Sequence, residues 1–209
     1  MKGLLLKDWY MMKKYCRSYL FITVVFVAVS LVNNDNLFFV FYPCLLCGMM
    51  PVTLLGYDER SRWTQYSATL PYTKAQIVSA KYLIGLFAQG AILIVTAIAQ
   101  SIKMTAAGTF VFSELAVLML LVLIIATVTS SISLPFMFKL GVEKGRTAYY
   151  VMIGFVCGAS VFASSLLKLQ IMSAIHPNAI LAVLAIAGIG VYFLSWYMSI
   201  AFYKKREIQ

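Results

Sequence analysis

The side chains that could act as acids, bases or nucleophiles are few, and they stand at the ends of long apolar runs. Hydrolysis or group transfer within a membrane requires a carboxylate, a histidine, or a nucleophile with its base, placed where a substrate can reach it. No Asp, Glu, Lys or Arg lies in the middle of an apolar run. We therefore predict that the chain is not an enzyme and carries no carboxylate relay for protons or sodium ions. The acids and the one histidine are Asp8, Asp35, Asp58, Glu59, Glu114, Glu143, Glu207 and His176.

The cysteines and glycines form no recognisable metal, redox or nucleotide site. Cys44 and Cys47 make a C-x-x-C pattern, but it lies inside an apolar run, and no second pair completes a metal site. We interpret both as small packing residues. The phosphate-binding pattern G-x-x-x-x-G-K-[ST] does not occur in the chain. We expect no catalytic residue, metal or cofactor in this chain.

The composition places these sparse polar residues in a membrane protein. Hydrophobic residues make up 62% of the 209 residues and charged residues only 11%, and the mean hydropathy is +0.89. A soluble domain covers its core with a surface of roughly 25 to 35% charged residues. This chain has too few charges for such a surface, so lipid must be its solvent.

The apolar runs are long enough to predict six membrane spans. A spanning helix needs about 20 largely apolar residues. The last run is too long for one span, and His176-Pro177-Asn178 is a natural break that leaves a helix from about Ala179 to Tyr203. We predict an all-α membrane protein with one six-helix domain over residues 18–203. The runs are 18–34, 36–57, 82–102, 115–138, 147–167 and 169–203.

The basic residues predict the orientation of these spans. The chain has 17 Lys and Arg, and all but Lys103 and Lys168 fall in the N-terminal segment, the second-to-third connection, the fourth-to-fifth connection or the tail. Basic residues accumulate on the cytoplasmic side, so we expect both termini in the cytoplasm, with residues 204–209 as a basic tail. The basic residues behind the net charge of +10 are thus distributed as topology signals and as sites of attraction to anionic lipid. This distribution argues against nucleic-acid binding.

Residues 1–17 are predicted to form an amphipathic helix on the cytoplasmic surface of the membrane. Asp8 falls on the apolar side of this helix, where we expect it to face a neighbouring protein group. The alternative is that the basic residues are ordinary anchors that extend the first span. The residues on the basic arc are Lys2, Lys7, Lys13, Lys14 and Arg17.

The second-to-third connection is the most charged and aromatic stretch between two apolar runs. We expect Asp58 to cap a short helix that starts near Glu59 and stops at Leu70-Pro71. The sequence TKAQ at 73–76 predicts a capping box that starts the next helix. Trp, Tyr and Arg are typical anchors of protein contacts, although an aromatic belt with positive-inside charges would look the same.

The span interiors offer candidates for helix packing and for a substrate path. Gly154 and Gly158 form a G-x-x-x-G pattern that suits either a dimer contact or a contact within the chain. Pro43 and Pro51 predict kinks. Polar span residues either bond neighbouring helices or touch substrate, and without a charged cavity an amphipathic or hydrophobic cargo fits best. The possible substrate-path residues are Met49, Met50, Gln89, Thr96, Thr127 and Thr129.

The order of these features resembles the permease subunits of bacterial type-2 ABC exporters. The N-terminal MKGLLLKDWYMMKKY is similar to a compact six-span branch that includes exporters of phenol-soluble modulins and other antimicrobial peptides. The chain has Ala68-Thr69 where relatives often have Ser before Leu-Pro. The pattern in the connection is carried by Asp58, Glu59, Trp63, Tyr66, Leu70, Pro71, Lys81 and Tyr82.

The resemblance implies a bacterial plasma-membrane transporter driven by a separate ATPase that binds ATP and magnesium. Residues 57–70 would be the coupling helix that docks on the ATPase, and residues 1–17 the connector helix. Two permease subunits, identical or paralogous, would form the pathway. The alternatives are an exporter of lipids or hydrophobic drugs and a non-transporting sensor or immunity subunit. The implied ATPase contacts are Tyr57, Asp58, Glu59, Arg60, Arg62, Trp63 and Tyr66, with Val142, Glu143, Lys144 and Arg146 in the fourth-to-fifth connection.

Overall fold

Every regular element in the computed structural model is an α-helix within the residues it describes, which are 1–32, 38–67, 69–147, 150–151 and 177–205. This confirms the prediction of an all-α chain for those residues. Residues 142–147 are also helical. The helices are α1 (Lys2–Tyr15), α2 (Arg17–Val32), α3 (Phe38–Gly48), α4 (Met50–Arg60), α5 (Trp63–Ser67), α6 (Lys74–Ala106), α7 (Phe112–Leu140) and α9 (Pro177–Lys205).

Four helical segments among the described residues are long and apolar enough to cross a membrane. The count rises to five if the bent pair of α1 and α2 forms one span. Most of the predicted fifth span, 147–167, lies outside the described residues, so six spans and the orientation of the termini stay predictions. The four segments are Phe38–Arg60, Lys74–Ala106, Phe112–Leu140 and Val183–Lys205.

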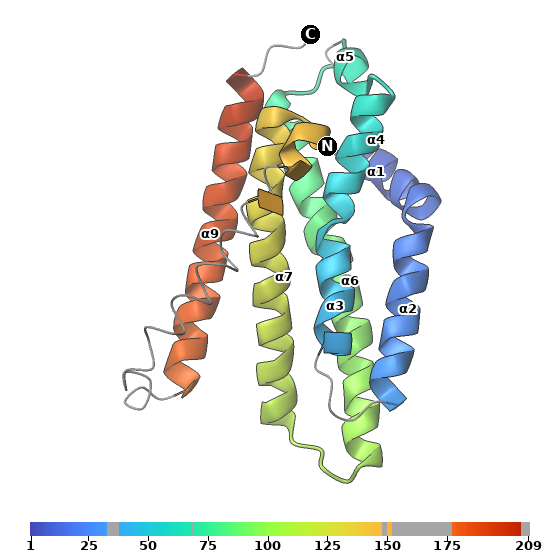
Figure 1. The fold of residues 1–209 in the computed structure, drawn as a ribbon. Coiled ribbons are helices and arrows are strands. Elements are labelled where there is room, and N and C mark those ends of the chain that lie inside the picture. The colour runs from blue at the N-terminus through green and yellow to red at the C-terminus, as the bar shows by residue number, and fades with distance from the viewer. Residues whose placement is uncertain (33–37, 68, 148–149, 152–176, 206–209) are drawn as a thin grey trace.

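The chain turns sharply where the predicted surface helix ends. α1 and α2 are bent by 66° at a break, where the Cys16 side chain is fully buried. Figure 1 shows α1 lying across one end of the bundle, whereas α2, α3, α6, α7 and α9 run roughly along one direction. α4 and α5 lie at the same end as α1, and we call this the α1 end.

The predicted break in the second span is present, and α6 packs closely against it. Pro51 follows the break at Met49, at the start of α4, whereas Pro43 stays inside α3. Proline lacks the N–H that would bond the preceding turn. A Cβ atom built on Gly85 of α6 would lie only 2.6 Å from Pro51 Cγ. α4 and α6 can approach this closely because position 85 has no side chain.

α6 starts where its sequence signal predicts. Thr73 Oγ1 accepts a hydrogen bond from Gln76 N at 3.2 Å, and Thr73 N donates to Gln76 Oε1 at 3.2 Å. This reciprocal pair is the predicted capping box, which satisfies two backbone donors that a helix start leaves open. α6 then runs for 33 residues and packs against α1, α3, α4, α7 and α9.

A polar cluster holds α9 against α6. Tyr82 Oη lies 2.7 Å from both Ser195 Oγ and Ser199 Oγ, and the Tyr82 ring stacks on Trp196. The Ser195 hydroxyl also donates to the Ser131 carbonyl of α7. Hydrogen bonds between helices replace the hydrophobic driving force that lipid does not supply. The outer face of α9 is apolar and exposed, as expected for a helix that faces hydrocarbon.

Candidate functional site

Both connections that the sequence singled out line one pocket at the α1 end. The pocket has a volume of about 470 Å³ and lies between the end of α4 and the turn that follows α7. It therefore brings together residues that are more than 80 positions apart in the sequence. Its lining residues are Thr53, Gly56, Tyr57, Glu59, Arg60, Leu140, Gly141, Val142, Glu143, Lys144 and Arg146.

One side chain ties the two connections together. Glu59 Oε2 accepts a hydrogen bond from Val142 N at 2.8 Å. Val142 opens the helical residues 142–147, and a carboxylate at a helix N-terminus satisfies an open N–H and interacts favourably with the helix dipole. Gly141 turns the chain into this helix with a φ of 83°, a conformation that glycine adopts without steric cost.

The helical residues 142–147 fold back tightly onto α7. A Cβ atom on Gly145 would lie 2.9 Å from Met137 Cα and 3.0 Å from the Phe136 carbonyl oxygen. Backbone atoms cannot swing aside as the end of a flexible side chain can. The absence of a side chain at position 145 therefore allows this close contact, which positions the pocket wall formed by residues 142–146.

The predicted short helix is divided, and Asp58 does not cap it. Asp58 lies in the last turn of α4, which continues to Arg60, and the next helix begins at Trp63 rather than near Glu59. Arg62 separates the two with a φ of 54°, which is uncommon for a residue other than glycine. The prediction of a cap at Asp58 was wrong because its carboxylate is bound by lysines from other helices.

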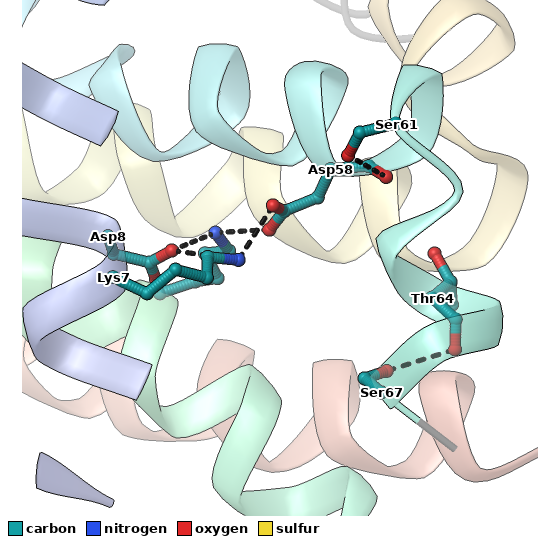
Figure 2. A network of polar contacts seen from close by, with 7 residues as sticks. Lys7, Asp8, Asp58, Ser61, Thr64 and Ser67 are labelled. Atoms are coloured by element: carbon teal, nitrogen blue, oxygen red, sulfur yellow. Dashed lines mark hydrogen bonds and ion pairs between the residues drawn. The ribbon is translucent and has the colours of Figure 1, made fainter. Parts of the chain in front are cut away.

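Two lysines and two aspartates form a buried ring of alternating charge, which we call the ion quartet: Lys7, Asp8, Asp58 and Lys81. Lys81 Nζ lies 2.7 Å from Asp8 Oδ1 and 2.6 Å from Asp58 Oδ2. Lys7 Nζ lies 2.7 Å from Asp58 Oδ1 and 3.3 Å from Asp8 Oδ1. Figure 2 shows the Lys7 and Asp8 side chains pointing toward Asp58. Each charge therefore touches both opposite charges.

The quartet is shielded from solvent and has no net charge. The Asp8 and Lys81 side chains are 2% exposed and that of Asp58 is 6% exposed, whereas the Lys7 side chain is 22% exposed. An isolated charge in such a place would carry a large desolvation penalty. The two cations and two anions offset that penalty for one another, because each charge is paired with an opposite one.

Comparison with known protein families identifies the chain. The family model described as ABC-2 family transporter protein matches residues 3–204. The chain belongs to this family. It is an ABC-2 permease, the membrane component of an ABC transporter and not its catalytic part, and the family implies an ABC ATPase as partner. Neither the search of curated proteins nor that of solved structures found a match.

The sequence signalled only part of the permease's ion quartet. Asp8 was expected to face a neighbouring protein group, and its contact with Lys81 confirms this. Lys81 was counted among the topology signals, and Lys7 was placed on the basic arc of the surface helix. The one available signal was a carboxylate on an apolar helix face, which requires a cation from another element.

Aromatic contacts fasten α1 of the permease to the second-to-third connection, residues 57–70. Lys7 Nζ lies 4.2 Å from the centroid of the Trp63 ring, a cation–π contact. The Tyr15 and Tyr57 rings are stacked with centroids 4.2 Å apart. Tyr66 remains 58% exposed. Two of the three predicted aromatic contacts for an ATPase therefore already pack against the permease's own N-terminal helix.

The polar residues of the permease's spans mainly bond within the chain. Gln89 Nε2 donates to the Ala126 carbonyl at 3.1 Å, and Thr96 donates to the Ile92 carbonyl at 3.0 Å. Thr127 and Thr129 bond carbonyls of their own helix, α7. Gln89 Oε1 has no hydrogen-bond partner among the described residues.

The remaining predicted pathway and packing residues differ in burial, and two of them lie outside the described residues. Met50 is 1% exposed inside the bundle, whereas Met49 at the α3–α4 break is half-buried. Cys44 and Cys47 are free thiols buried in the core, which fits their interpretation as packing residues. Gly154 and Gly158 lie outside the described residues.

Proposed function

We propose that this permease exports amphipathic or hydrophobic peptides across the bacterial plasma membrane and is driven by a separate ATPase that docks at the α1 end. The observation that carries the proposal is a pocket lined by both the second-to-third and the fourth-to-fifth connection. Because Glu59 bonds Val142, a partner seated there would contact both connections at once.

The exposed part of this surface is basic, which defines the chemistry of the partner. Among the pocket's lining residues, Arg60, Lys144 and Arg146 are exposed, against one exposed acid, Glu143, and the neighbouring Arg62 is exposed too; we call these five residues the docking surface. A complementary acidic groove on the ATPase would steer association and set its orientation. Asp58 is omitted from the proposed docking surface because both of its carboxylate oxygens contact lysines within the chain.

The proposed cargo follows from the polarity of the spans. No acid or base stands in the middle of an apolar run, and the polar groups described there, apart from Gln89 Oε1, bond neighbouring backbone and side chains. A strongly charged or sugar-like substrate would find few partners in such an interior, whereas an amphipathic peptide could keep its apolar face against it. Two permease subunits, with ATP and magnesium held by two ATPases, complete the proposed transporter.

Docking can be tested by co-purifying the permease with an ABC ATPase that carries a Walker-A motif and is encoded in a neighbouring reading frame. We expect the wild-type chain to retain the ATPase, and the variant R60E/K144E to lose it because two basic contacts become acidic. The variant K204E/K205E is the matched control, since it reverses two exposed charges at the end of α9. Equal retention by both variants would contradict docking at this pocket.

Cargo is tested with the reconstituted complex in vesicles. We expect amphipathic helical peptides to stimulate ATP hydrolysis and to accumulate on the side away from the ATPase. Stimulation by lipids or hydrophobic drugs alone would show that this class of compound, and not peptides, is the cargo. Hydrolysis that no compound of these classes changes, together with no transport, would favour a sensor or immunity subunit.

A further inference from the structure

The ion quartet joins three helices that the chain could otherwise move separately. Lys7 and Asp8 belong to α1, Asp58 lies in the last turn of α4, and Lys81 lies in the second turn of α6. Within the quartet, the contact of Lys81 Nζ with Asp58 Oδ2 at 2.6 Å directly connects α4 to α6. α4 leads into residues 57–70, which we call the coupling connection because the proposed ATPase would dock there, and α6 is the span that follows it.

Burial makes the Asp58–Lys81 ion pair costly to separate. A movement that pulled Asp58 away from Lys81 would leave charges of a shielded cluster without partners, and the desolvation penalty would no longer be offset. The low local polarity also strengthens the attraction relative to a surface pair. A displacement of the end of α4 is therefore expected to carry the start of α6 with it.

The contacts continue on both sides of the quartet. Toward the coupling connection, Lys7 reaches from Asp58 to the Trp63 ring of α5, beyond the turn at Arg62. Toward the bundle, Tyr82 follows Lys81 directly and binds Ser195 and Ser199 of α9. The backbone joins α5 to α4, and from α4 the Asp58–Lys81 pair and Tyr82 lead to α9, so this path does not depend on the Lys7 contact.

We propose that the Asp58–Lys81 ion pair transmits movement of the coupling connection to α6, with Lys7 and Asp8 completing the charge balance. Lys81 is then a positioning residue for transport. It lies outside the docking surface, and it acts by keeping α6 in step with α4. This inference rests on the proposed function, because it requires an ATPase that moves the α4–α5 connection.

Two balanced double variants of the full chain test the ion pair. D58N/K81M removes the α4–α6 pair and leaves Lys7 with Asp8 at 3.3 Å. K7M/D8N removes the same number of charges and leaves Lys81 with Asp58 at 2.6 Å. Neither variant leaves an unpaired member of the quartet, and neither changes an exposed residue of the docking surface.

The readouts are ATPase co-purification and the amount of peptide transported per ATP hydrolysed. We expect both variants to retain the ATPase. Transport per ATP should fall about tenfold in D58N/K81M, within the usual range of coupling between sites, and remain near the wild-type value in K7M/D8N. A purely structural role would lower folded complex and hydrolysis together without changing this ratio. An unchanged ratio in D58N/K81M, or an equal loss in both variants, would overturn the inference.

A second measurement needs no variant. Hydrogen exchange of the wild-type complex, with and without a non-hydrolysable ATP analogue, should change together in peptides covering the end of α4 and the start of α6. A change confined to α4 would overturn the transmission role even if D58N/K81M failed to fold. If the wild-type chain retains no ATPase at all, the proposed function fails first, and this inference fails with it.

Discussion

Lys81 Nζ lies 2.7 Å from Asp8 Oδ1, although the two residues are 73 positions apart in the sequence. Both side chains are 2% exposed. The contact anchors the N-terminal helix to α6 and makes each charge dependent on the other. The position of α1 in this ABC-2 permease is therefore set by an ionic contact as well as by its amphipathic pattern.

Removing one charge from the quartet should destabilise the permease more than removing a pair. The variant D8N leaves two lysines sharing Asp58, and breaking a buried ion pair in this way costs about 3–5 kcal/mol. The variant D8N/K81M leaves Lys7 with Asp58 at 2.7 Å and should recover most of the loss. Thermal unfolding in detergent measures both. A double variant no more stable than D8N would contradict the charge balance.

Two glycines of α6 should respond in opposite ways to alanine. The variant G85A places a Cβ atom 2.6 Å from Pro51 Cγ, in a ring that cannot swing away, and such overpacking costs about 1–3 kcal/mol. The variant G90A meets no atom within 4 Å and should be neutral or slightly stabilising, because alanine favours helix. The unfolding temperatures of the two variants, measured under the same conditions, test this expectation. Equal stability of both variants would show that α4 and α6 are not in close contact.

The hydroxyl of Tyr82 should contribute measurably to the attachment of α9. The variant Y82F removes its contacts with Ser195 and Ser199, and hydrogen bonds between membrane helices are worth about 0.6 kcal/mol each on average. Tyr197 is 77% exposed on the same bundle, so Y197F is the matched control. We expect a lower unfolding temperature for Y82F alone. Identical unfolding temperatures for the two variants would show that these hydrogen bonds do not stabilise the packing of α9.

Gly145 should be required for the shape of the proposed docking pocket. The variant G145A places a Cβ atom within 3.0 Å of two backbone atoms of α7, which must displace residues 142–147 and weaken ATPase retention. The variant G56A is the control in the same pocket, because its Cβ atom meets Val142 Cγ1 at an ordinary 3.4 Å. Co-purification with the ATPase compares them. Undiminished retention by G145A would mean that this wall does not contact the ATPase.

Features that depend on neighbours in the sequence were predictable. The apolar runs predicted α6, α7 and α9, the TKAQ sequence predicted the capping box at Thr73, and Pro51 predicted the break in the second span. The wrong prediction concerned Asp58, which sequence alone favoured as a cap. Capping is a hydrogen bond to a nearby backbone N–H, so the neighbouring sequence can suggest it. The Asp58 carboxylate instead binds Lys7 and Lys81 from other helices, which the neighbouring sequence does not reveal.

By itself, the sequence determined that this chain is an all-helical membrane protein, and it located the two connections that carry charge. Tertiary structure decided that Glu59 meets Val142 and that Asp58 meets Lys7, across separations of 83 and 51 residues. Helix length and caps follow from local backbone and side-chain preferences. Contacts between distant residues depend on how the helices pack, because burial determines which charges must find partners and the bundle determines which partners lie within reach.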